Sequence, residues 1–139
     1  MKRTVIALSM LGLVLAMSTP VFANNHADTR LPGDKKVGFS YSTAAETGLR
    51  TKEDTSSHYI KNASGFDLWV VSKTSNNLNK TVKGYAIIPS GTQRRIRNTV
   101  KEDGYSSCKL NITSAKSGVS GYLEGVWSPD SIGSYIAAN

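Results

Sequence analysis

Two histidines and one cysteine are the side chains of this chain whose ordinary pKa lies nearest neutral pH, which makes them the first candidates for a general base or a nucleophile. His26 lies in a polar stretch, with nothing nearby to hold its ring in one tautomer. His58 lies in a run where it shares a face with Ser56 and Ile60, as a residue of a β-strand would. No second histidine of the predicted folded region and no His-Glu-x-x-His motif accompanies His58 to complete a zinc site. We therefore predict no catalytic residue, no metal ligand and no cofactor-binding residue.

The single cysteine, Cys108, cannot close an internal disulfide bond. It shares a strand face with Leu110 and Ile112, and burial among apolar side chains raises a thiol pKa and makes the thiol unreactive. We predict a buried structural cysteine; an intermolecular disulfide bond and a nucleophile paired with a histidine are the weaker alternatives. Neither a Gly-x-Ser-x-Gly elbow nor a glycine-rich phosphate loop occurs. The chain is therefore predicted not to be an enzyme, with a hydrolase as an unfavoured alternative.

The densest run of positive charge is a candidate contact for an anionic partner, and its members are Arg94, Arg95, Arg97 and Lys101. On a strand, Arg95 and Arg97 share one face and Arg94 takes the other, so they form no continuous patch unless the strand twists or bulges. The favoured interpretation is an edge strand protected by charge, which Glu102 and Asp103 partly neutralise. The alternative is contact with a cell-wall polymer or an anionic membrane surface.

Aromatic side chains on the predicted strands could stack on sugar rings if they are exposed, and these are Trp69, Tyr85, Tyr122 and Trp127. Aromatic residues on strands more often belong to the core. We retain Trp69 and Trp127 as candidate aromatic contacts.

The first 23 residues have the three regions of a secretory signal peptide. Lys2 and Arg3 give the positive start, about 13 apolar residues follow, and Ala23 ends a short cleavage region. The apolar stretch is shorter than the roughly 20 residues of a membrane-spanning helix, so we expect cleavage after Ala23. Cleavage removes 23 of 139 residues and two cations, which leaves 116 residues and a net charge of +5 in place of +7.

Export also limits the partners that we expect. Residue 24 is Asn and not Cys, so we expect no lipid anchor there and no transmembrane anchor after cleavage. A secreted, extracellular protein has no ordinary access to nucleic acid, and we predict no nucleic-acid partner. A cell-wall polymer or another exported protein remains as the expected partner.

The rest of the chain divides into two parts. Residues 24–36 are polar, charged and interrupted by Pro32 and Gly33, so we expect a short flexible leader there. Residues 37–139 have short runs of β-branched and aromatic residues, separated by turn-forming residues, and no long run at helical spacing. These runs predict strands at about 37–42, 55–62, 66–73, 80–88, 92–98, 105–113 and 119–127.

Short turn-forming segments at residues 63–65, 89–91, 102–104 and 115–118 predict hairpins between consecutive strands, which must then be antiparallel. Alternation places Leu68 and Val70 on an inward face, and Gly125 indicates a bulge or a close backbone approach. The predicted fold is all-β: residues 37–139 form a single antiparallel β-sandwich or meander of about seven strands, preceded by the signal peptide 1–23 and the leader 24–36.

Three segments, residues 57–61, 98–107 and 125–131, resemble small exported proteins of Firmicutes that form a family of unknown function. Residues 98–107 read Asn-Thr-Val-Lys-Glu-Asp-Gly-Tyr-Ser-Ser. The resemblance implies a secreted β-rich domain and transfers no catalytic or binding residue. A weaker likeness is to the lactococcin 972 type of bacteriocin, which is also exported, β-stranded and free of internal disulfide bonds.

Together these observations predict a secreted, non-enzymatic binding or interaction protein that acts at the cell envelope or outside the cell. Export, small size and positive charge leave a bacteriocin-like antimicrobial protein or toxin as the alternative.

Overall fold

A computed structural model describes residues 23–139 of the chain. The predicted signal peptide, apart from Ala23, lies outside the described residues. Within 23–139, no helix is both long enough and apolar enough to cross a membrane.

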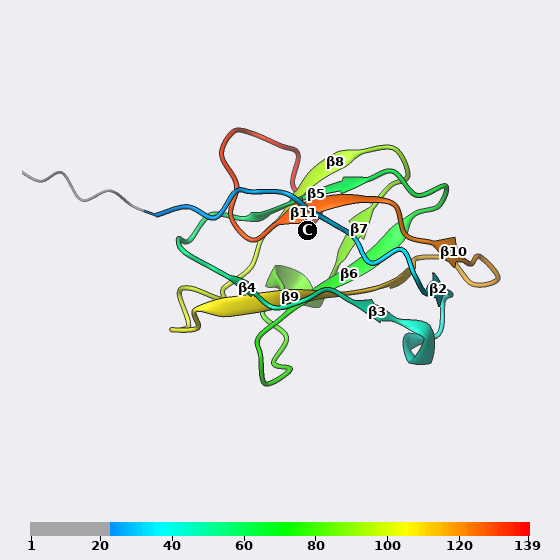
Figure 1. The fold of residues 1–139 in the computed structure, drawn as a ribbon, viewed down its shortest axis with the longest axis horizontal. Coiled ribbons are helices and arrows are strands. Elements are labelled where there is room, and N and C mark those ends of the chain that lie inside the picture. Colours follow the sequence, from blue (N-terminus) through cyan, green and yellow to red (C-terminus); the bar gives the residue numbers. More distant parts are fainter. Residues whose placement is uncertain (1–22) are drawn as a thin grey trace, which may run out of the picture.

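Two antiparallel sheets form the fold (Figure 1). The first, here called the β5 sheet, has the order β1 (Thr29–Arg30), β11 (Gly125–Ser128), β5 (His58–Asn62) and β8 (Gln93–Ile96). The second, the β9 sheet, has the order β3 (Ala45–Glu46), β9 (Ser107–Ser114), β6 (Leu68–Lys73) and β7 (Ala86–Ile88), and β4 (Arg50–Thr51) also pairs with β9. A separate pair joins β2 (Lys36–Val37) to β10 (Gly121–Tyr122), and two 3-10 turns, η1 (Tyr41–Thr43) and η2 (Val82–Gly84), complete the elements. The predicted antiparallel β-sandwich is confirmed.

The core lies between the two sheets, because alternate side chains of each strand point inward. Ile60 and Trp127 come from the β5 sheet, and both are almost completely buried. The β9 sheet supplies Leu68, Val70, Cys108, Leu110 and Ile112, each with no exposed surface. The alternation predicted for residues 66–73 and 105–113 therefore identified the inward faces of the two central strands.

Several strand predictions differ from the structure in extent. Residues 80–88 contain η2 before the short strand β7, and residues 119–127 are divided between β10 and most of β11. Residues 37–42 hold only the end of β2 and the start of η1. The two-residue strands β1, β3 and β4 were not predicted, because two residues are too few to show alternation and only their partner strands define them.

The four short connections that were predicted as hairpins are not hairpins. Residues 63–65, 89–91 and 102–104 lie between strands that belong to different sheets, and residues 115–118 lead from β9 to β10, which pairs with β2. A few extended residues span the separation of about 10 Å between packed sheets, so a short connection is compatible with either arrangement. The buried Asn62 holds the first crossing, since its Nδ2 donates to the carbonyl oxygens of Phe66 (2.9 Å) and Ile88 (3.0 Å).

The segment 24–36 is not a flexible leader, contrary to the prediction. Its strand β1 pairs with β11, and the side chain of Leu31 is 5% exposed and belongs to the core. The Arg50 guanidinium donates a hydrogen bond of 2.6 Å to the carbonyl oxygen of Ala27. Hydrogen bonds to distant residues order this segment, and its polar composition gave no sign of them.

Gly125, where a bulge or a close backbone approach was predicted, provides a test of the fold. Its φ is +131°, and a Cβ there would overlap the carbonyl oxygen of Lys61 on β5. We expect Gly125→Ala to lower the free energy of unfolding by about 3 kcal/mol or more, because β11 and β5 must move apart. Gly65→Ala is the matched control, since a Cβ at Gly65 meets nothing within 4 Å. Equal urea midpoints for the two variants would contradict the described register.

Candidate functional site

A buried ion pair joins the ends of two strands from different sheets. Lys52 follows β4, Asp130 follows β11, and neither side chain has exposed surface. The Lys52 ammonium donates to Oδ1 of Asp130 and to the carbonyl oxygens of Asp54 (2.7 Å) and Ser56 (2.6 Å). A buried charge must be both paired and hydrogen-bonded, and these three acceptors satisfy the three protons of the ammonium group.

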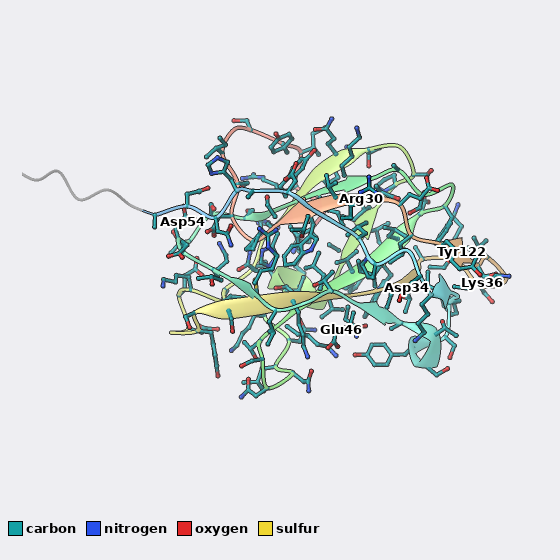
Figure 2. The ribbon with its side chains drawn as sticks, viewed as in Figure 1. Arg30, Asp34, Lys36, Glu46, Asp54 and Tyr122 are labelled. Atoms are coloured by element: carbon teal, nitrogen blue, oxygen red, sulfur yellow. The ribbon has the colours of Figure 1, made fainter. Side chains whose placement is uncertain are left out.

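The beginning of the described chain completes this site. The other oxygen of Asp130, Oδ2, accepts hydrogen bonds from the backbone nitrogens of Asn25 (2.8 Å) and Glu53 (2.9 Å). The Asn24 side-chain amide donates to Asp54 over 2.6 Å, and Figure 2 shows Asp54 at the end of the molecule where the described chain begins. Burial raises the pKa of Asp54, but hydrogen bonds from Ser56 and Asn24 outweigh this effect and hold the pKa at about 2.

His58 lies on β5 and is completely buried beside this ion pair. Its Nδ1 is 2.7 Å from the carbonyl oxygen of Pro129, which can only accept, so Nδ1 carries the proton. Its Nε2 then accepts from the Ser72 hydroxyl over 2.6 Å. Burial lowers the pKa of His58 to about 3, and the nearby charge of Lys52 acts in the same direction. His58 is therefore a neutral strand residue with both ring nitrogens occupied.

Cys108 is buried and free, as predicted. Burial raises the pKa of its thiol to about 12, so that almost no thiolate forms near neutral pH. Its register partner is Arg50 on β4, and its neighbours on the inward face are Leu110 and Ile112. The thiol is enclosed by the core and is not open to solutes.

The four predicted cationic residues do not form one site. Arg95 is exposed, whereas Arg94 is half-buried and donates to the carbonyl oxygen of Gln93 over 2.9 Å. The Arg97 guanidinium donates to the carbonyl oxygen of Asn139, with Nε 2.7 Å from that oxygen. Lys101 is half-buried in the connection after β8.

The C-terminal residues also run beside β8. The backbone nitrogen of Arg95 donates to the carbonyl oxygen of Ile136 over 3.0 Å. The backbone nitrogen of Ala138 donates to the carbonyl oxygen of Arg95 over 2.9 Å. β8 is the edge strand of the β5 sheet, as predicted for the arginine run, and the C-terminal residues cover part of this edge through the bridge between Arg95 and Ala137.

The two predicted aromatic contacts lie in different environments. Trp127 is 1% exposed in the core, with the Arg50 guanidinium 5.5 Å from its ring centroid, so it presents no ring surface to a ligand. Trp69 is half-buried on the outer side of β6. Its ring stacks on that of Tyr85, with centroids 5.6 Å apart and planes inclined by 18°.

Trp69 belongs to a group that we call the aromatic face, formed by Phe39, Tyr41, Trp69 and Tyr85. Phe39, Tyr41 and Tyr85 are 56%, 54% and 48% exposed. A surface hollow beside them is lined by Phe39, Tyr41, Trp69, Thr113 and Ser114. Three aromatic rings line this hollow, against two, Tyr59 and Tyr135, at another hollow of the described surface, so we take the aromatic face as the candidate functional site.

A short turn brings Phe39 and Tyr41 to this place. The Gly38 carbonyl oxygen accepts from the Ser114 nitrogen at the end of β9 over 2.9 Å. The Thr43 hydroxyl accepts from the Gly38 nitrogen over 2.8 Å and closes the turn that contains η1. Phe39 and Tyr41 were not predicted as site residues, because they follow a two-residue strand that shows no alternation. The Phe-x-Tyr spacing was visible, but its position over β6 and β9 was not.

Polar groups surround the aromatic face. Lys73 donates to the Tyr41 hydroxyl, and its ammonium lies 5.0 Å from the Tyr41 ring centroid. Asn111 is on the same side of β9 as Thr113, and its Oδ1 is the one buried side-chain polar atom of residues 23–139 without a hydrogen-bond partner. Such atoms are rare in folded proteins, so the unused acceptor distinguishes this side of the β9 sheet.

Comparison with known proteins identifies a family. A family model described as "Protein of unknown function (DUF2712)" matches residues 19–131. The chain belongs to the DUF2712 family. The expected membership of a family of unknown function is thereby confirmed, and the match includes both the Lys52–Asp130 pair and the aromatic face. No curated protein and no solved structure matches this DUF2712 protein.

The buried ion pair of the DUF2712 protein can be tested by removing one charge. We expect Lys52→Met to lower the free energy of unfolding by about 3–5 kcal/mol, because the Asp130 carboxylate stays buried without its cation. The double variant Lys52→Met/Asp130→Asn should recover part of this loss, since the amide oxygen can still accept from the backbone. Lys116→Met, at a side chain that is 70% exposed, is the control and should change stability by less than about 0.5 kcal/mol. Urea unfolding that shows equal losses at Lys52 and Lys116 would contradict this role.

The buried neutral state of His58 predicts a pH dependence. The pKa of His58 is about 3 in the folded protein and near 6.5 ordinarily, so between these values the unfolded chain binds more protons. This contribution to stability is complete above pH 6.5, and it decreases by up to about 1.4 kcal/mol per pH unit as the pH falls. Urea unfolding between about pH 7 and pH 5 measures the slope. His58→Gln should remove most of this pH dependence, and His26→Gln should leave it in place. A slope that survives His58→Gln would contradict its assignment to His58.

Proposed function

We propose that this DUF2712 protein is an exported, non-enzymatic binding protein whose aromatic face takes a saccharide chain at the cell envelope. The observation that carries the proposal is the stacked Trp69–Tyr85 pair beside a hollow lined by Phe39, Tyr41, Thr113 and Ser114.

The chemistry of this surface favours a sugar. Exposed aromatic rings cost free energy in water, and a contiguous exposed patch of them usually marks a binding surface. Sugar rings have flat faces of C–H groups and polar edges, so one side can lie on the rings while hydroxyl groups reach polar neighbours. Trp69, with Phe39 and Tyr41, offers the ring platform at the hollow, which Thr113 and Ser114 also line, and Lys73 lies over the Tyr41 ring.

Two further features support the other parts of the proposal. The signal-peptide pattern of residues 1–23 supports export and action at the envelope or outside the cell. The burial of both His58 and Cys108, with the pKa of each shifted away from the reactive range, supports a non-enzymatic role. A cell-wall polymer is then the expected partner.

Saccharide binding can be measured directly on the purified protein. The probes are N-acetylglucosamine oligomers and a soluble glucan, followed by calorimetry and by protection of Trp69 from acrylamide quenching. We expect Trp69→Ala to weaken binding at least about tenfold, which is about 1.4 kcal/mol, because the platform is lost. Tyr85→Ala should weaken it by less, since Trp69 remains.

The matched control is Tyr122→Ala, an exposed aromatic on β10 that does not line the hollow. This variant should bind as the original protein does. Absence of binding to all saccharide probes, or an equal loss in Tyr122→Ala and Trp69→Ala, would contradict the proposed site.

A further inference from the structure

Three positive side chains share the outer side of the β5 sheet, opposite the aromatic face. Arg30 on β1 pairs with Val126, which pairs in turn with Lys61 on β5. Arg95 on β8 pairs with Tyr59, two residues from Lys61 on the same strand. Register partners and residues two apart share a face, so Arg30, Lys61 and Arg95 point the same way. All three are exposed.

These residues extend across four strands, with Arg30 and Lys61 level in register and Arg95 offset by two residues, and we call them the cationic track. Arg30 and Lys61 are two strand spacings apart, so about 10 Å separates their backbones. One strand spacing and two residues separate Lys61 from Arg95, which is about 8 Å. Within residues 23–139, no carboxylate forms an ion pair with any of the three.

A hollow lies between the first two cations of the track. Its lining includes Arg30, Lys61, Leu123, Glu124 and Val126. Gly125 also lines it, and β11 can approach β5 so closely there only because this residue has no Cβ. A concave surface between two cations suits a chain that lies across the sheet better than the flat surface of a membrane. Two acidic residues adjoin the track, Glu124 in the hollow and Asp28 before β1.

We propose that the cationic track binds a linear polymer that carries phosphate groups. Guanidinium groups match phosphate oxygens with two parallel hydrogen bonds, and the ammonium group of Lys61 lies between the two arginines as a point charge. Arg30 lies on the side of β11 and β5, and Glu46, from the outer side of the β9 sheet, lies on the other side of the molecule (Figure 2). The two proposed surfaces therefore lie on opposite sides of the molecule, and this second site does not depend on the aromatic face.

The test uses the purified protein and three probes: long-chain inorganic polyphosphate, polyglutamate, and vesicles that contain phosphatidylglycerol. We expect polyphosphate to bind most tightly, with an affinity that falls as salt rises. Lys61→Gln and Arg30→Gln should each weaken polyphosphate binding about fivefold, and Glu124→Gln should strengthen it about twofold or more. Trp69→Ala should bind polyphosphate unchanged, which separates this site from the saccharide site.

Lys116→Gln is the charge-matched control, because it removes one cation in the connection between β9 and β10. An effect below about twofold for Lys116→Gln, with the losses above for Lys61→Gln, supports the track. Equal losses in the two variants would overturn it, because net charge alone would then explain the binding. Binding of polyglutamate or of the vesicles as tight as that of polyphosphate would overturn it as well.

Discussion

The Lys52–Asp130 pair is the interaction on which the rest of the structure depends. Lys52 follows a strand of the β9 sheet and Asp130 follows a strand of the β5 sheet, so the pair joins the two layers at one end of the sandwich. Both charges are buried, and each is stable there only while every remaining hydrogen-bonding position is filled. The backbone of Asn25 fills one of these positions, which explains why a polar segment is attached to the fold.

At the same end of the molecule, burial and hydrogen bonds keep the His58 imidazole neutral. His58 is wedged between the Pro129 carbonyl oxygen and the Ser72 hydroxyl, and its ring meets Trp127 edge-on at 5.9 Å. Burial beside the Lys52 charge disfavours a second proton on the imidazole ring. The interior therefore uses its titratable groups for structure, and the proposed binding surfaces lie on the outer faces of the two sheets.

Connections that cross from one sheet to the other place neighbouring parts of the chain on opposite outer faces. Consecutive strands such as β5 and β6 belong to different layers, so residues that are close in sequence, such as Lys61 and Trp69, belong to opposite surfaces. Each surface is then assembled from strands that are far apart in the chain: Arg30 and Arg95 on one side, Phe39 and Trp69 on the other. Short loops between adjacent strands of one sheet would have placed these side chains differently.

The sequence by itself determined the all-β class, the inward faces of β6 and β9 and the burial of Cys108, and it limited Gly125 to a bulge or a close approach, because alternation and glycine geometry are local properties. Tertiary structure decided which strands pair, since a short turn-forming segment fits a hairpin and a crossing equally well. It also decided that residues 24–36 are ordered, that Trp127 is buried while Trp69 stays partly exposed, and that Arg30 and Lys61 share a sheet face with Arg95. These outcomes depend on contacts between residues distant in sequence, whose desolvation and hydrogen-bond partners no local pattern records.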